Sequence, residues 1–113
     1  MPVTSLITQQ AKVLASMQLS KDEIRSFCQR HGIRKLAFFG SVLRPDFNSD
    51  SDIDVLVEFD PATRVGFFEM YDMEQELSRL LCGRKIDLNT PNSLSEYFRQ
   101  EVLAEAQVQY VAT

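Results

Sequence analysis

The sequence predicts an α/β fold of the α+β type, in which a small mixed β-sheet has helices packed on one face. Short apolar runs rich in β-branched residues predict three strands, at residues 35–39, 53–59 and 85–89. Longer segments around them have apolar residues at helical spacing. The chain of 113 residues has no repeats or linkers, so we expect a single domain over residues 1–113.

Four helices are expected around these strands, at residues 5–19, 20–31, 66–81 and 93–110. The first has only a weak apolar stripe, and we interpret residues 1–19 as an N-terminal helical arm and a candidate partner surface. Ser20 and Glu23 form a capping box that starts the second helix, and Ser93 and Glu96 form one for the fourth. The third helix carries a core-facing stripe of methionine and leucine.

Two aspartates stand at the start of the second expected strand. Asp52 and Asp54 are separated by one residue, and residues i and i+2 of a strand point to the same face. Aspartate is a poor strand former, so a pair at this place needs a reason. Two neighbouring carboxylates repel each other unless a cation lies between them. Hard oxygen ligands select Mg²⁺ or Mn²⁺, so the pair predicts a divalent-metal site.

A Gly-Ser pair follows the first expected strand and supplies a candidate phosphate site. Gly40 allows the backbone to approach a ligand closely. Ser41 can cap a short helix from Val42 onward, whose free N–H groups bind phosphate. Arg44 lies about one helical turn further and can reach a triphosphate. Together with the carboxylate pair, these residues predict a site for a nucleoside triphosphate and its metal.

Gly40-Ser41, then ten residues, then Asp52-x-Asp54 resembles the motif of the nucleotidyltransferases of the DNA polymerase β superfamily. Over roughly residues 20–110, the chain looks like the minimal nucleotidyltransferases, small prokaryotic proteins often encoded beside a HEPN-domain partner as the antitoxin of a toxin–antitoxin pair. The resemblance implies a polymerase β-type nucleotidyltransferase core. One departure is Pro45, where many relatives carry glycine; proline is compatible with leaving a short helix.

A third carboxylate stands in the third expected strand. Asp87 alternates with Ile86 and Leu88, so it faces the side of Asp52 and Asp54 if their strands are neighbours. Taken alone, an aspartate in so short a strand is typically a surface residue. In the resembled family the matching aspartate is a third metal ligand and receives the proton of the attacking hydroxyl, a role that two-metal phosphoryl transfer requires.

The resemblance implies a metal-dependent enzyme that moves AMP from ATP to a protein partner. Asp52, Asp54 and Asp87 would hold two Mg²⁺ or Mn²⁺ ions, and Gly40, Ser41 and Arg44 would bind the nucleotide phosphates. The implied acceptor is a tyrosine of a HEPN ribonuclease toxin, which the transfer neutralises. Two alternatives stay open: an antitoxin that inhibits its partner by occlusion without catalysis, and a subunit of a two-component nucleotidyltransferase acting on a small molecule or RNA.

Aromatic residues at the start of the third helix are candidates for stacking on the base of the nucleotide. These are Phe67, Phe68 and Tyr71. The chain has 16 acidic and 12 basic residues and a formal charge of −4, which argues against direct nucleic-acid binding. Homo-oligomerisation is left open.

The sequence also bears on the cellular compartment. No apolar stretch approaches the ~20 residues of a membrane span. The N-terminus lacks the basic and apolar regions of a signal peptide. Cys28 and Cys82 have no metal-binding spacing and are interpreted as reduced thiols. A cytoplasmic protein is therefore expected.

Overall fold

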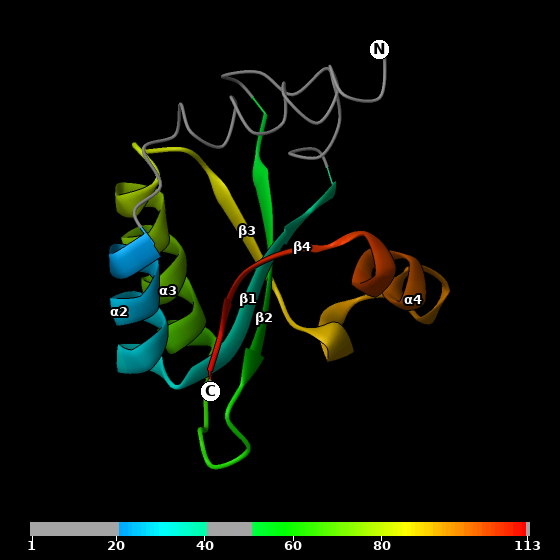
Figure 1. The fold of residues 1–113 in the computed structure, drawn as a ribbon, viewed down its shortest axis with the longest axis horizontal. Coiled ribbons are helices and arrows are strands. Elements are labelled where there is room, and N and C mark those ends of the chain that lie inside the picture. The colour runs from blue at the N-terminus through cyan, green and yellow to red at the C-terminus, as the bar shows by residue number, and fades with distance from the viewer. Residues whose placement is uncertain (1–20, 41–50, 113) are drawn as a thin grey trace.

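The computed structural model describes residues 21–40 and 51–112. The predicted arm at residues 1–19 and the short helix expected from Val42 onward lie outside these residues. Along the described chain the elements are α2 (Lys21–His31), β1 (Ile33–Phe39), β2 (Ile53–Phe59), α3 (Phe67–Leu80), β3 (Ile86–Asn89), the short 3₁₀ helix η2 (Pro91–Ser93), α4 (Glu96–Glu105) and β4 (Gln107–Val111) (Figure 1). None of the helices described here is long and apolar enough to cross a membrane.

The strands form one mixed sheet in the order β3-β2-β1-β4. β1 is antiparallel to both β2 and β4, whereas β2 and β3 run parallel. Parallel neighbours need a crossover connection, and α3 provides it. α2 and α3 pack together on one face of the sheet (Figure 1). The predicted α/β fold with a small mixed sheet is therefore confirmed, but only α2 and α3 cover the predicted face, because η2 and α4 lie on the other side of the sheet.

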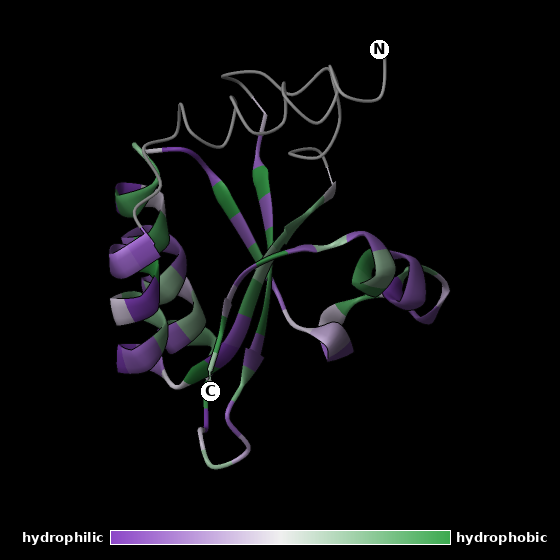
Figure 2. Cartoon of the chain, viewed as in Figure 1, coloured by the Kyte–Doolittle hydropathy of each residue, from purple (hydrophilic) through white to green (hydrophobic). Residues whose placement is uncertain are grey.

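The core lies between this helix pair and the sheet. α2 buries Ile24, Phe27 and Cys28 at the i, i+3 and i+4 positions that the apolar pattern predicts. Alternate residues of β2, beginning with Ile53, are fully buried against them. Hydrophilic residues follow the outer sides of α2 and α3, and hydrophobic residues follow the central strands (Figure 2). Burial raises the pKa of the Cys28 thiol to about 12.

A polar contact joins α2 to α3 at the surface of this core. Arg30 Nη1 donates a hydrogen bond of 2.8 Å to Glu76 Oε1, and His31 Nε2 lies 3.0 Å from Glu76 Oε2. Burial acts to raise the pKa of Glu76, but the hydrogen bonds and charges of Arg30 and His31 outweigh it and hold that pKa below its ordinary value. His31, the only histidine, also packs on the Phe27 ring, so it has a structural place.

The prediction of one long final helix over residues 93–110 is wrong. α4 ends at Glu105, and Gln107–Val111 forms β4, which pairs with β1. The free edge of β1 provides hydrogen-bond partners for this short segment, and a helical pattern read along the chain cannot show that edge. The capping residue also differs from the prediction: Ser95, not Ser93, caps α4 by accepting a hydrogen bond from the Tyr97 N–H at 3.3 Å.

The sheet face opposite α2 and α3, which an arrangement with helices on one face alone would leave open, is partly covered. Ala37 and Leu56 are cross-strand partners on the face that carries Asp54, yet they are 1% and 2% exposed. η2 contacts β2, so the chain that follows β3 covers part of this face. The carboxylates therefore lie on a face that is partly covered, not on one that is open along its whole length.

Candidate active site

The end of β1 lies directly against Asp54. Phe39, the last residue of β1, is the cross-strand partner of Asp54, and Gly40 follows with a φ of +69°. A Cβ at position 40 would lie 3.1 Å from Asp54 Cγ and closer still to Oδ2. Only glycine meets both demands, since it tolerates positive φ and has no side chain. Ser41 and Arg44, the other predicted phosphate-binding residues, lie outside the described residues.

Asp54 and Asp87 are direct neighbours across two parallel strands. They occupy the same register position of β2 and β3, strands that lie about 4.8 Å apart in such a sheet. Ile86 and Leu88 are buried on the helix-covered face, so Asp87 points to the opposite one. The arrangement that alternation predicted for Asp87 is present: its strand lies beside that of Asp54, and the two carboxylates share a face.

Asp52 lies just before β2, at the same end of the sheet. Its side chain is half exposed, and Oδ2 lies 3.8 Å from the Nζ of Lys85, which immediately precedes β3. The Ile53 N–H donates to the Lys85 carbonyl at 2.9 Å, so the starts of β2 and β3 are tied together. Arg84 Nη2 donates to the Ser51 carbonyl at 2.9 Å.

Arg84 and Lys85 therefore border the carboxylates, although from the sequence they are expected only as surface charges near the site. Both precede Asp87 by only a few residues, and that proximity is the signal that could have indicated them. Lysine and arginine beside clustered carboxylates reduce their repulsion, and they also attract polyphosphates.

The three aspartates fit a divalent metal in their chemistry. Hard carboxylate oxygens suit Mg²⁺ and Mn²⁺, and Gly40 keeps the space beside Asp54 free of a side chain. In the part of the chain that the structure describes, no three histidine, cysteine, aspartate or glutamate side chains converge on one metal position. Rotation of the side chains, Asp52 away from Lys85 included, is needed before Asp52, Asp54 and Asp87 can bind together.

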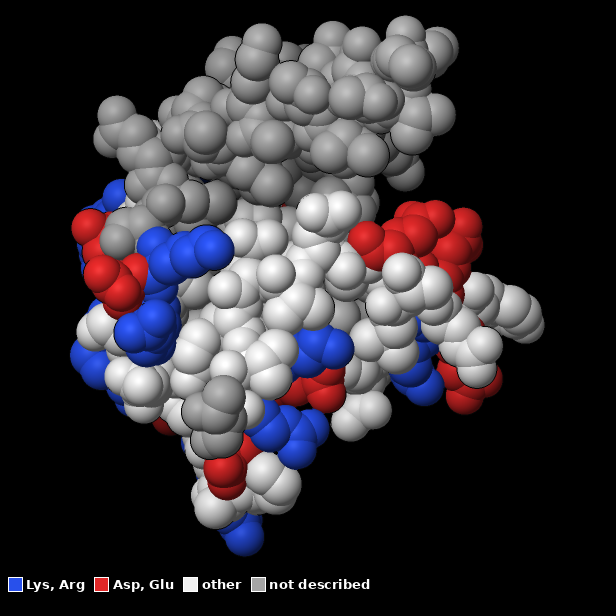
Figure 3. All heavy atoms as spheres, in the orientation of Figure 1, with Lys and Arg blue, Asp and Glu red and all other residues white. Residues whose placement is uncertain are grey.

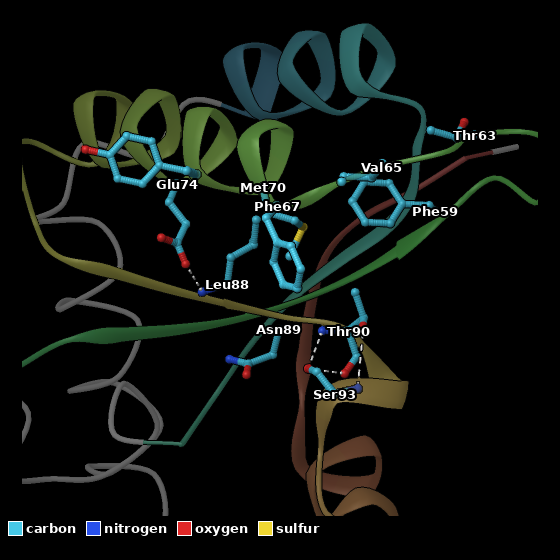
Figure 4. Close-up of a pocket in the computed structure, with 12 residues that line it drawn as sticks. Phe59, Thr63, Val65, Phe67, Met70, Glu74, Leu88, Asn89, Thr90 and Ser93 are labelled. Atoms are coloured by element: carbon cyan, nitrogen blue, oxygen red, sulfur yellow. Dashed lines mark hydrogen bonds between the residues drawn. The ribbon is translucent and has the colours of Figure 1, made fainter.

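A separate cavity of about 690 Å³ lies beneath the start of α3 (Figure 4). Its walls include Phe59, Phe67, Met70, Tyr71, Leu88 and Thr90. None of the three aspartates lines it, because Leu88 faces α3 whereas Asp87 faces away. Phe67 and Tyr71 line this cavity, and stacking of the α3 aromatic residues on the base of a nucleotide stays a prediction.

Gly40 lies beside Asp54, and Asp54 lies beside Asp87 on a mixed sheet, an arrangement that fits the nucleotidyltransferase class of enzymes. Residues 22–112 match the family described as Polymerase beta, Nucleotidyltransferase, and the chain belongs to that family. Among curated relatives, the protein adenylyltransferase MntA of Thermococcus cleftensis is 34% identical over 85 residues, which are 75% of this chain and 80% of that protein.

Solved structures share the fold. A crystal structure of a toxin–antitoxin with AMP-PNP matches with a TM-score of 0.66 at 21% identity, covering 84% of this chain and 76% of the other. A structure of tri-AMPylated Shewanella oneidensis HEPN toxin in complex with MNT antitoxin matches with a TM-score of 0.56 at 22% identity, covering 85% and 73%.

Proposed function

We propose that this chain transfers AMP from ATP to a tyrosine hydroxyl of a HEPN-type ribonuclease partner and thereby neutralises it, in a reaction that depends on Mg²⁺ or Mn²⁺. The observation that carries the proposal is the shared register of Asp54 and Asp87 beside Gly40. The name of the Thermococcus relative supports adenylyl transfer to protein, and the toxin–antitoxin structures support an ATP-like ligand and a HEPN partner.

The reaction exchanges one phosphoanhydride bond for one phosphodiester bond. The acceptor oxygen attacks the α-phosphorus of ATP, the bond to the bridging oxygen breaks, and pyrophosphate leaves. Asp87 accepts the proton of the hydroxyl, because it lies on the exposed side of the edge strand β3, where an acceptor can approach. Bound divalent metal supplies charge neutralisation of the triphosphate. Asp52 and Asp54 would hold it together with Asp87.

Phosphate binding is assigned to the segment that leaves β1. Gly40 leaves room for the Asp54 carboxylate at the end of the strand, and its missing side chain lets a phosphate approach the backbone that follows. Backbone N–H groups after Ser41 would bind phosphate oxygens, and the Arg44 guanidinium would add charge-assisted hydrogen bonds. Arg44→Ala should therefore weaken ATP binding more than Ser41→Ala, since the backbone donors remain when only the hydroxyl is lost. Titration calorimetry with ATP and Mg²⁺ measures the difference.

The second candidate function is inhibition of the partner by occlusion alone. It is supported by Tyr97 and Phe98, which are 92% and 60% exposed and offer a contact surface that needs no catalysis.

The decisive experiment supplies ATP labelled at the α-phosphate, Mg²⁺ and the protein encoded beside this chain's gene. We expect label on that protein and release of pyrophosphate. Asp87→Asn should abolish labelling while retaining nucleotide binding, since proton acceptance is lost but the phosphate contacts are not. Label from the γ-phosphate instead would indicate a kinase. If no label is transferred and Asp87→Asn still neutralises the partner, occlusion is the function.

A further inference from the structure

α4 is a helix without a core of its own. None of its ten residues is buried, and Tyr97 and Phe98 are 92% and 60% exposed. It projects from the side of the sheet opposite α2 and α3 (Figure 1). An isolated helix of this length is marginal in water, because most helical stability in proteins comes from packing an apolar face. Exposed aromatic side chains on such a helix mark an interaction surface.

The inner side of α4 contacts the segment that precedes the helix. Arg99 donates from Nε to the Pro91 carbonyl at 2.7 Å and from Nη2 to the Leu94 carbonyl at 3.2 Å, which anchors the helix to the chain before it. Val102, one turn further, is half-buried on the same side. The only cation of α4 is therefore turned away from its outer face.

The outer face combines aromatic and acidic side chains. Tyr97, Glu101 and Glu105 follow one another at i, i+4 and i+8, and Phe98 flanks this stripe. Within the described residues, Glu101 and Glu105 have no ion-pair partner. Acidic side chains gather on the lobe that α4 forms (Figure 3). A surface of this composition is complementary to an apolar pocket with a basic rim.

We propose that α4 is the docking helix for the HEPN-type partner, with Tyr97 and Phe98 in an apolar pocket and Glu101 and Glu105 against lysine or arginine at its rim. This identification of the partner rests on the proposed function. A ribonuclease neutralises RNA phosphates with basic side chains, so the surface that best fits α4 is the RNA-binding face of the partner. Docking there blocks RNA independently of adenylyl transfer, and the formal charge of −4 favours the encounter.

Three double variants test the proposal in calorimetric titrations with the neighbouring gene product, without ATP. Tyr97→Ala with Phe98→Ala should weaken binding about 30-fold or more, as expected for central aromatic anchors. Glu101→Lys with Glu105→Lys should weaken it and reverse its dependence on salt, because lysine keeps the helix but repels a basic rim. The matched control removes Phe67 and Phe68, which are 94% and 87% exposed on α3, and should leave affinity unchanged.

Competition and self-association complete the test. Single-stranded RNA should compete with the wild-type chain for the partner; simultaneous binding of both would overturn the placement on the RNA face. Equal affinities for the wild type and both α4 variants would overturn the docking role. Dimerisation of the chain alone in sedimentation, lost in the α4 variants, would show that a second copy occupies the helix and would overturn the proposal as well.

The two proposals fail in different ways. If the α4 variants label the partner from α-labelled ATP as strongly as the wild-type chain does, docking through α4 is overturned and adenylyl transfer stands. Binding that depends on α4, with no label transferred by the wild-type chain, would support the docking proposal and overturn the enzymatic one.

Discussion

The substitution Gly40→Ala adds a single methyl group and tests whether the close approach of Gly40 positions the Asp54 side chain. Alanine at a φ of +69° costs about 1–2 kcal/mol, because L-residues with a side chain disfavour the left-handed region. The new Cβ would also lie 3.1 Å from Asp54 Cγ and closer to Oδ2, so the carboxylate has to leave its rotamer. An off-rotamer side chain costs about 1 kcal/mol. Together these terms predict a loss of about 2–3 kcal/mol for Gly40→Ala.

Gly83→Ala is the matched control for the backbone term. Gly83 has a φ of +79°, and among the described residues other than its chain neighbours no atom lies within 4 Å of a Cβ built there. Its substitution should cost only the conformational part, about 1–2 kcal/mol. The difference between the two variants therefore measures the clash with Asp54. In an Asp54→Ala background this difference should disappear, which makes a double-mutant cycle.

Urea unfolding followed by circular dichroism gives the free energies, and a thermal melt should show Tm lowered by roughly 8–15 °C for Gly40→Ala. Displacement of Asp54 should also abolish adenylyl transfer, whereas Gly83→Ala should retain it. Equal costs at positions 40 and 83, together with undiminished transfer by Gly40→Ala, would refute the argument that the end of β1 positions Asp54.

Four further outcomes are expected. Asp52→Asn should abolish transfer. In the absence of metal its free energy of unfolding should stay within about 0.5 kcal/mol of the wild-type value or rise slightly, because the change relieves repulsion at a half-exposed site. A loss of several kcal/mol in urea melts would show a structural role. Mg²⁺ with ATP should raise Tm far more than either alone, and metal-independent stabilisation by ATP would contradict the proposed chemistry. Glu76→Gln should lower the free energy of unfolding by about 1 kcal/mol at pH 7. Because the pKa of Glu76 in the folded state lies below its ordinary value of 4.5, the ionised side chain stabilises the fold above pH 4.5, and this stabilisation is lost as the pH falls through the lowered pKa. A difference between variant and wild type that does not change with pH would be contrary evidence. Iodoacetamide should modify exposed Cys82 in the native state but buried Cys28 only after unfolding, and mass spectrometry of the modified peptides distinguishes the two.

Much of the helix-covered half of the molecule could be predicted from local pattern. α2 ends at His31, the expected end, and β2 spans the expected residues, because the apolar period acts within a few positions of the chain. The same alternation placed Asp87 opposite Ile86 and Leu88. The resemblance of Gly40-Ser41, ten residues and Asp52-x-Asp54 to the nucleotidyltransferase motif indicated the family, since all its residues lie within one short segment.

What the sequence alone determined is therefore which residues face together along each element. Which elements become neighbours was decided by the tertiary structure. Asp87 meets Asp54 only because β3 pairs in parallel beside β2, and Gly40 meets Asp54 only because β1 pairs on the other side. The final segment, predicted as a helix, became β4 because β1 had an unpaired edge whose backbone groups it could satisfy. Hydrogen bonds between strands join residues far apart in the chain, and no local period encodes them.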